Sequence, residues 1–268
     1  MAILRTHGIG LNYVETGEGD QCIVFSHGLL MNHRMFDAQV AALSDRYRCI
    51  AYDHRGQGAS EVPEGAHISI EDCTADALSL IRALGTTPCH FVGLSMGGFV
   101  GLRLAARHPE LLRSLTLIAS AADAEPRANI PKYRRLNFVA RWFGVGRPLA
   151  NKVMPILFGS TFLGDNSRSA DIDAWRNHVM ANRKTIYKAV NGVLYRDPVP
   201  EGALRGITTP TQVIRGTEDV AIARERSLRV CEVVPGARFV EVEGAGHSAS
   251  VEEPGAVTAA IEEFITSC

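Results

Sequence analysis

The sequence predicts an α/β fold, in which helices flank a mostly parallel, twisted sheet and a helical lid is inserted after the sixth strand. Short apolar runs alternate with longer segments of helical period, which is typical of a parallel sheet with crossover helices. Most of these apolar runs show no polar alternation, so we expect strands that are buried on both faces. The alternation stops over residues 123–205, which predicts the insertion.

Eight strands are expected. Residues 3–6 and 11–15 are joined at glycines and predict a hairpin near the start of the chain. The other six runs are apolar almost throughout and predict the central strands, at residues 22–26, 49–52, 90–94, 114–119, 211–215 and 239–242.

Helices are expected between these strands, at residues 36–43, 70–84, 98–107, 224–233 and 254–266. The second of them carries one apolar stripe, which predicts packing against the sheet. The segment 123–205 has a sequence pattern typical of helices and is rich in large apolar side chains. We therefore expect a core built from residues 1–122 and 206–268, with residues 123–205 forming the lid.

Composition excludes several classes of function. The 268 residues are 46% hydrophobic, and 28 Lys and Arg against 29 Asp and Glu leave a net charge of −1. Without a basic excess, nucleic acid is not expected as the main partner. No apolar run reaches the length of about 18 residues that spans a bilayer, so no membrane insertion is expected. The first residues lack the apolar core of a signal peptide, which predicts a cytoplasmic protein, either a monomer or a small homo-oligomer.

The six cysteines form no CxxC pair and lie mostly inside apolar runs. They therefore predict small buried side chains rather than a metal site or a disulfide framework. We expect no metal and no cofactor.

The most specific signal is the sequence Gly93-Leu94-Ser95-Met96-Gly97-Gly98, which joins a predicted strand to a predicted helix. A G-x-S-x-G sequence at this junction forms a sharp turn that presents the serine oxygen at the carboxyl edge of the sheet. Ser95 is therefore the candidate nucleophile.

A serine nucleophile needs a base and an acid that orients the base. His247 lies in a glycine-rich loop after the last strand and is the candidate base. Asp219 follows the strand at 211–215 and completes the chain order Ser, Asp, His. Asp123, after the preceding strand, is the alternative candidate for the acid. Glu218, next to Asp219, is expected to be an exposed charge of the loop.

The oxyanion of a tetrahedral intermediate needs two backbone N–H donors. One belongs to the residue after the nucleophile, Met96. The second is expected from the loop after the strand at 22–26, where Leu29 is preferred and Leu30 is the alternative.

These motifs resemble those of the α/β-hydrolase fold superfamily. The Ser26-His27-Gly28 segment is similar to its oxyanion loop, residues 53–60 to its D-x-R-G-x-G-x-S turn, residues 93–98 to its nucleophile elbow, and Gly246-His247 to its histidine loop. Within the superfamily, the chain resembles small lid-bearing serine esterases and lactonases, including the enol-lactonase and acyl-homoserine-lactonase groups. The serine at the elbow argues against the dehalogenase and epoxide hydrolase branches, which carry an aspartate there.

The resemblance implies an enzyme that hydrolyses a carboxylic ester or lactone through an acyl-enzyme intermediate. The lid is expected to bury a largely hydrophobic acyl group, with contacts from Phe138, Trp142, Leu157, Phe158 and Trp175. Two alternatives stay open. One is a ligand-binding sensor of the same fold with little turnover, and the other is an enol-lactonase or C–C hydrolase that acts on a small carboxylated substrate.

Overall fold

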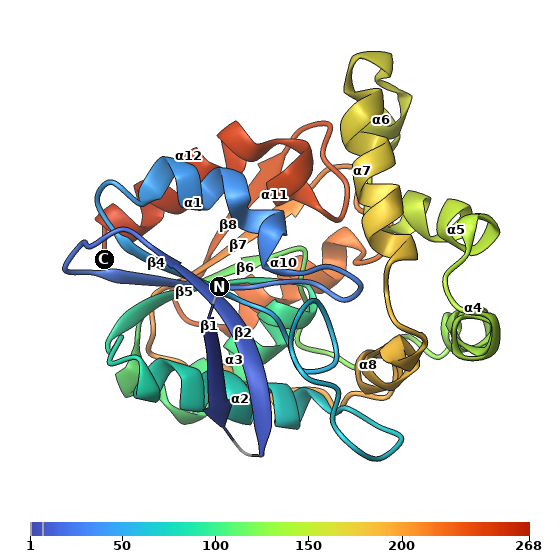
Figure 1. The fold of residues 1–268 in the computed structure, drawn as a ribbon. Coiled ribbons are helices and arrows are strands. Elements are labelled where there is room, and N and C mark those ends of the chain that lie inside the picture. Colours follow the sequence, from blue (N-terminus) through green and yellow to red (C-terminus); the bar gives the residue numbers. More distant parts are fainter. Residues whose placement is uncertain (1, 7) are drawn as a thin grey trace.

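The computed structural model describes residues 2–6 and 8–268, and it is built around one sheet of eight strands (Figure 1). The strand order is β1-β2-β4-β3-β5-β6-β7-β8. The pairs β1·β2 and β2·β4 are antiparallel and all other neighbours are parallel. The strands are β1 Ala2–Thr6, β2 Ile9–Thr16, β3 Cys22–Ser26, β4 Arg48–Tyr52, β5 Cys89–Leu94, β6 Leu112–Ile118, β7 Thr211–Gly216 and β8 Arg238–Val242. The predicted α/β class with a mostly parallel sheet is confirmed.

Helices cover both faces of the sheet, which is why the central strands carry apolar residues on both sides. Every residue of β3, β5 and β7 is buried. Helices α1 Asp37–Leu43 and α12 Pro254–Thr266 pack together on one face, and α2 Ile70–Ala83 and α3 Met96–Arg107 pack together on the other (Figure 1). The remaining elements of the core are η1 His33–Phe36, η2 Pro109–Leu111, α10 Arg224–Val233 and α11 Ala249–Glu252.

The chain between β6 and β7 is helical, so the predicted insertion after the sixth strand is confirmed (Figure 1). The lid limits at residues 123 and 205 stay a prediction. The helices in this segment are α4 Ile130–Phe143, α5 Arg147–Leu157, α6 Ser160–Gly164, η3 Asn166–Arg168, α7 Ser169–Met180, η4 Lys184–Ile186, α8 Tyr187–Leu194 and α9 Glu201–Arg205.

Polar side chains of the lid bind backbone carbonyls of the core loops beneath it. Arg183 donates to the carbonyls of Gly58 and Ser60 at 2.7 and 2.9 Å. Lys188 donates to the carbonyl of Pro63 at 2.8 Å. These bonds satisfy carbonyls that irregular loops would otherwise leave unpaired, and they fix the lid to the turn that follows β4.

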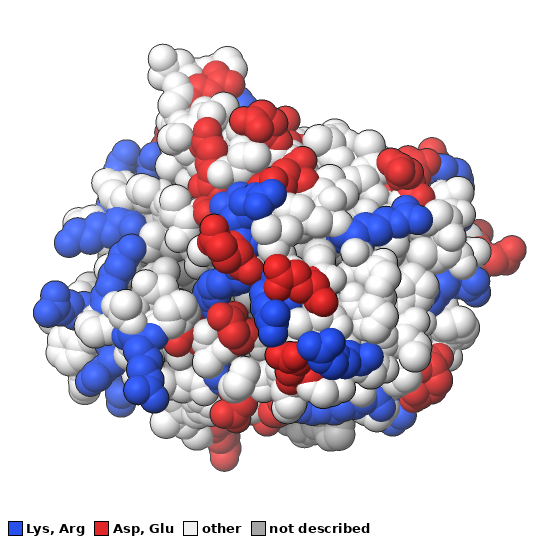
Figure 2. Space-filling model, turned by 180° about the vertical axis from the view of Figure 1, so that it is seen from behind, with Lys and Arg blue, Asp and Glu red and all other residues white. Residues whose placement is uncertain are grey.

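Charge is distributed unevenly over the surface. Figure 2 shows basic side chains gathering on the side where the lid helices lie, whereas acidic and basic side chains alternate elsewhere on that face. Between residues 126 and 164 the sequence has seven Lys or Arg and no Asp or Glu. The lid is therefore basic in a chain whose net charge is close to zero. Across residues 2–6 and 8–268, no helix has both the length and the hydropathy to span a membrane.

The helix α8 touches the core through Gly192, which lies against the backbone of Ile68, so that an added Cβ would collide with the carbonyl oxygen. We expect Gly192→Ala to lower the free energy of unfolding by about 1–3 kcal/mol, the usual cost of overpacking. The matched control is Gly202→Ala in α9, where nothing lies within 4 Å of an added Cβ. Urea denaturation of both variants checks this, and equal midpoints would contradict the contact.

Candidate active site

The turn between β5 and α3 places Ser95 in a conformation that few non-glycine residues adopt. Its φ is 49°, and its N–H donates to the carbonyl of Ile118 at 2.8 Å. A Cβ at Gly93 would collide with the backbone of Gly97, and a Cβ at Gly97 would collide with the carbonyl of Ser26. The glycines are thus needed because the strand, the turn and the helix approach one another too closely for side chains.

Two loops bring Asp219 and His247 together. The loop after β7 carries Asp219, and the loop after β8 carries His247. The Nδ1 of His247 lies 3.1 Å from both carboxylate oxygens of Asp219. Asp219 also accepts from the N–H groups of Ala221 and Ile222 at 2.8 and 3.1 Å, which fix the carboxylate in place.

This contact changes the acidity of both groups. Burial lowers the pKa of His247, but the charge and hydrogen bond of Asp219 outweigh it, so the pKa lies above its usual 6.5. Burial raises the pKa of Asp219, but the interaction with His247 and two backbone N–H donors hold it below its usual value. The carboxylate is therefore ionised at neutral pH and orients the imidazole.

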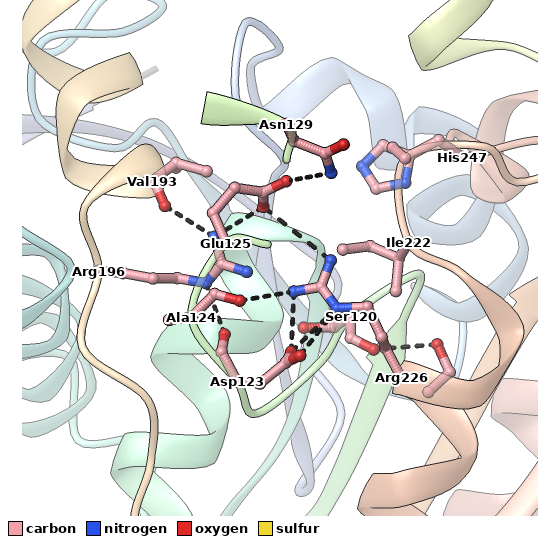
Figure 3. A network of polar contacts seen from close by, with 12 residues as sticks. Ser120, Asp123, Ala124, Glu125, Asn129, Val193, Arg196, Ile222, Arg226 and His247 are labelled. Atoms are coloured by element: carbon pink, nitrogen blue, oxygen red, sulfur yellow. Dashed lines mark hydrogen bonds and ion pairs between the residues drawn. The ribbon is translucent and has the colours of Figure 1, made fainter. Parts of the chain in front are cut away.

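The rival acid lies elsewhere. Asp123 is an exposed residue whose carboxylate pairs with Arg226 at 2.8 Å and does not contact His247 (Figure 3). Glu218, read from the sequence as an exposed loop charge, accepts hydrogen bonds from Ser160 Oγ and the Thr161 N–H at 2.9 and 2.8 Å. It therefore ties the loop of Asp219 to the lid.

The two expected oxyanion donors belong to the loop after β3, which carries Leu29, and to the start of α3, which carries Met96. Met96 is the first residue of α3, where N–H groups have no partner within the helix. In the loop after β3, the N–H of Leu30 already donates to Gln57 Oε1 at 2.8 Å. No acceptor for the N–H of Leu29 occurs among the hydrogen bonds of the described residues. The geometry thus favours Leu29 over Leu30.

Ser95 and His247 border a cavity of about 140 Å³ between the sheet and the lid. Its wall is almost entirely apolar, with contributions from the loop after β3, from α3 and from four lid helices. The apolar lining residues are Leu29, Leu30, Phe99, Leu136, Ala140, Val145, Leu149, Val153, Ile156, Leu157, Ile186, Val190, Val193, Leu194, Ala221 and Ile222.

Only one of the five predicted lid contacts, Leu157, lines this cavity. Phe138 and Trp142 are 61% and 58% exposed. They lie on the face of α4 opposite Leu136 and Ala140, because residues four apart share one face of a helix. Phe158 stacks on Phe162 and lies against Trp175, with ring centroids 5.1 and 6.3 Å apart, inside the lid. The large size of these aromatic residues suggested that they form the pocket. Instead, the helix faces that are directed toward the cavity carry mainly aliphatic side chains.

A buried carboxylate that was not predicted from the sequence, Glu252, lies under the loop of His247. Glu252 accepts from the N–H groups of Gly246 and Ser248 at 2.8 and 3.0 Å, and from Gly159 of the lid at 2.7 Å. Burial raises its pKa to about 7, against the lowering effect of these donors and His247. The only feature of the sequence that could have pointed to Glu252 is its position five residues after His247.

Titration of His247 distinguishes the two candidate acids. We expect Asp219→Asn to lower the pKa of His247, because burial is then no longer opposed by the charge and hydrogen bond of Asp219, the largest effects that raise this pKa. Asp123→Asn is the matched control and should leave that pKa above 6.5. NMR chemical shifts of the imidazole against pH provide the measurement. A larger change in the Asp123 variant would transfer the orienting role to that residue.

Comparison with known proteins agrees with this architecture. A family model described as the alpha/beta hydrolase fold matches residues 21–254. An enol-lactonase from Burkholderia xenovorans LB400 has a structure that superposes with a TM-score of 0.90 at 30% identity, covering 99% of this chain and 100% of that one. A thermophilic esterase from Thermogutta terrifontis gives a TM-score of 0.89 at 27% identity, covering 99% and 96%.

Two curated relatives are of similar length. 3-Oxoadipate enol-lactonase 2 from Acinetobacter baylyi is 28% identical, covering 97% of this chain and 94% of its own. RutD from Pseudomonas savastanoi pv. phaseolicola, provisionally named a carbamate hydrolase, is 29% identical, covering 87% and 88%. Because the family model spans most of the sequence, the chain belongs to the alpha/beta hydrolase fold family.

Proposed function

We propose that the protein hydrolyses a carboxylic ester or lactone with a largely hydrophobic acyl part, through an acyl-enzyme on Ser95. The observation that carries this is the apolar cavity that Ser95 and His247 border. An acyl chain bound there would present its carbonyl carbon to Ser95 and keep its apolar part out of water, which favours binding by up to about 0.8 kcal/mol for each buried methylene.

The proposed reaction has two halves, acylation of Ser95 and hydrolysis of the acyl-enzyme, and both use the same groups. The Oγ of Ser95 attacks the carbonyl carbon while Nε2 of His247 takes the hydroxyl proton, and Asp219 stabilises the resulting imidazolium. The carbonyl oxygen becomes an oxyanion, to which the N–H groups of Leu29 and Met96 donate. His247 then returns the proton to the leaving alkoxide, and the C–O bond breaks.

Water completes the cycle. His247 takes a proton from a water molecule that attacks the acyl carbon, and the second tetrahedral intermediate collapses to release the acid and restore the hydroxyl of Ser95. In a lactone the alkoxide and the acid are parts of one molecule, so a single hydroxy acid leaves. The names of the relatives, an enol-lactonase and an esterase, support this class of substrate.

Removing the nucleophile tests the proposal most directly. We expect Ser95→Ala to reduce kcat for an aryl ester by about a million-fold, with the thermal midpoint little changed. Asp219→Asn should cost about four orders of magnitude, and Asp123→Asn, the matched control, should cost little.

Two outcomes would contradict the proposal. More than a tenth of the activity left in the Ser95 variant would place the nucleophile elsewhere. One equivalent of acylation by the unsubstituted enzyme with no further turnover would favour the sensor of the same fold.

The apolar wall predicts the dependence on acyl chain length. For p-nitrophenyl esters, kcat/KM should rise roughly fourfold per methylene, up to about six to eight carbons, and then level off. Ala140→Phe should shift the optimum to shorter chains because Ala140 lines the cavity. Trp142→Ala, in the same helix but exposed, should leave the profile unchanged. A flat profile with a preference for small carboxylated esters would contradict an apolar acyl site.

A further inference from the structure

The outer face of the lid helix α4 exposes three aromatic rings. Phe138, Trp142 and Phe143 are 61%, 58% and 76% exposed. The opposite face of the same helix is directed inward, where Leu136 and Ala140 line the cavity. Rings of this size gain much free energy when they leave water. Several of them exposed together on one helix therefore indicate a surface that binds a partner.

Arginines lie between these rings. Arg134, Arg135 and Arg141 are exposed, and among the described residues none of them has a carboxylate within ion-pair distance. Arginines of the core, in contrast, mostly pair with a carboxylate. The surface formed by these six side chains, which we call the basic aromatic face, comprises Arg134, Arg135, Phe138, Arg141, Trp142 and Phe143.

Part of the basic aromatic face borders a groove of about 440 Å³ between α4 and α8. Its three arginines line the groove with Tyr187 and Tyr195, and no acidic side chain of the described residues does. The guanidinium carbon of Arg141 lies 4.5 Å from the ring centroid of Tyr187, an arrangement that orients this cation. Guanidinium groups bind phosphate oxygens through paired hydrogen bonds. The groove thus has the charge and the donors that a phosphate group requires.

The charge around the basic aromatic face has the same sign. Residues 126–164 contain seven Lys or Arg and no Asp or Glu, and residues 174–196 also contain no Asp or Glu. The second segment includes η4 and α8, which pack against α4. Figure 2 shows basic side chains gathering on this side of the molecule. A two-fold dimer through this face would place like charges against each other, so an anionic partner is favoured over a second copy of the chain.

The position of α4 favours a membrane over an acidic protein as that partner. The helix separates the apolar cavity from the basic aromatic face, because its two sides contribute to both. Esters with long apolar acyl parts concentrate in lipid rather than in water, so an enzyme for them gains by resting on a bilayer. This argument rests on the proposed function, whereas the charge and the exposed rings do not depend on it.

We propose that the basic aromatic face binds the surface of a bilayer that contains anionic phospholipids. The arginines bind phosphate oxygens of the headgroups, and the rings of Phe138, Trp142 and Phe143 lie at the boundary between headgroups and acyl chains. Helices that lie in this boundary combine basic side chains with Trp and Phe. Such a contact requires no helix that spans the membrane.

The test measures cosedimentation of Ser95→Ala with vesicles of phosphatidylcholine, with and without an equal amount of phosphatidylglycerol. Anionic vesicles should bind about tenfold more tightly or better, and high salt should remove the difference. No binding, or equal binding to both vesicles, would overturn the proposal. Because this variant lacks the proposed nucleophile, the result does not depend on hydrolysis. Turnover of p-nitrophenyl esters without vesicles tests the proposed function separately.

Two double variants locate the binding surface. In the same Ser95→Ala background, Arg134→Gln with Arg135→Gln should weaken binding to anionic vesicles by about tenfold or more. The matched control is Arg82→Gln with Arg238→Gln, which removes the same charge from two exposed sites of the core and should have little effect. Equal losses in both would overturn the role of the basic aromatic face. A dimer in light scattering that only the first pair dissociates, without vesicle binding, would assign the face to a second copy.

Fluorescence tests whether the rings reach the lipid. The chain has two tryptophans. Trp175→Phe leaves Trp142, whose emission should shift to shorter wavelength on anionic vesicles and be quenched by brominated acyl chains. Trp142→Phe is the matched control, because it leaves Trp175, which packs against Phe158 inside the lid and should not be quenched. Quenching of Trp175 alone would overturn the proposed orientation.

Discussion

The close approach of β3, β5 and α3 at the elbow is the constraint on which the rest of the site depends. Ser95 can stand at the carboxyl edge of the sheet only because Gly93 and Gly97 let the turn pass between the backbone of Ser26 and its own helix. The same approach places the first turn of α3 against the end of β3, and Phe99, one turn further along α3, lines the cavity. A rigid turn of this kind holds reacting groups without movement during the reaction.

Two carboxylates, the partly exposed Glu218 and the buried Glu252, connect the lid to the two loops that carry the proposed acid and base. Glu218 binds Thr161 from the loop of Asp219, and Glu252 joins Gly159 to the loop of His247. Both bonds converge on the short segment before and within α6. The lid therefore helps to position the imidazole as well as to cover the cavity. Charge-assisted hydrogen bonds to backbone N–H groups are strong enough for that task.

The wall of the cavity is almost entirely apolar. Burial of methylenes in such a wall distinguishes acyl chains by their length, until the cavity is full, rather than by their polar groups.

The sequence alone determined the sheet, the elbow and the insertion, because these depend on local period and on glycines at fixed offsets from Ser95. The chain order of Ser95, Asp219 and His247 could also be predicted from their places after strands. Only the tertiary structure decided that Asp123 pairs with Arg226 and that Phe138 and Trp142 are exposed to solvent. It also decided that Glu125, Arg196 and Phe99 lie close together at the cavity. Such contacts join residues that are far apart in the chain. They depend on which face of each lid helix is directed toward the core, and neither residue type nor periodicity specifies that face.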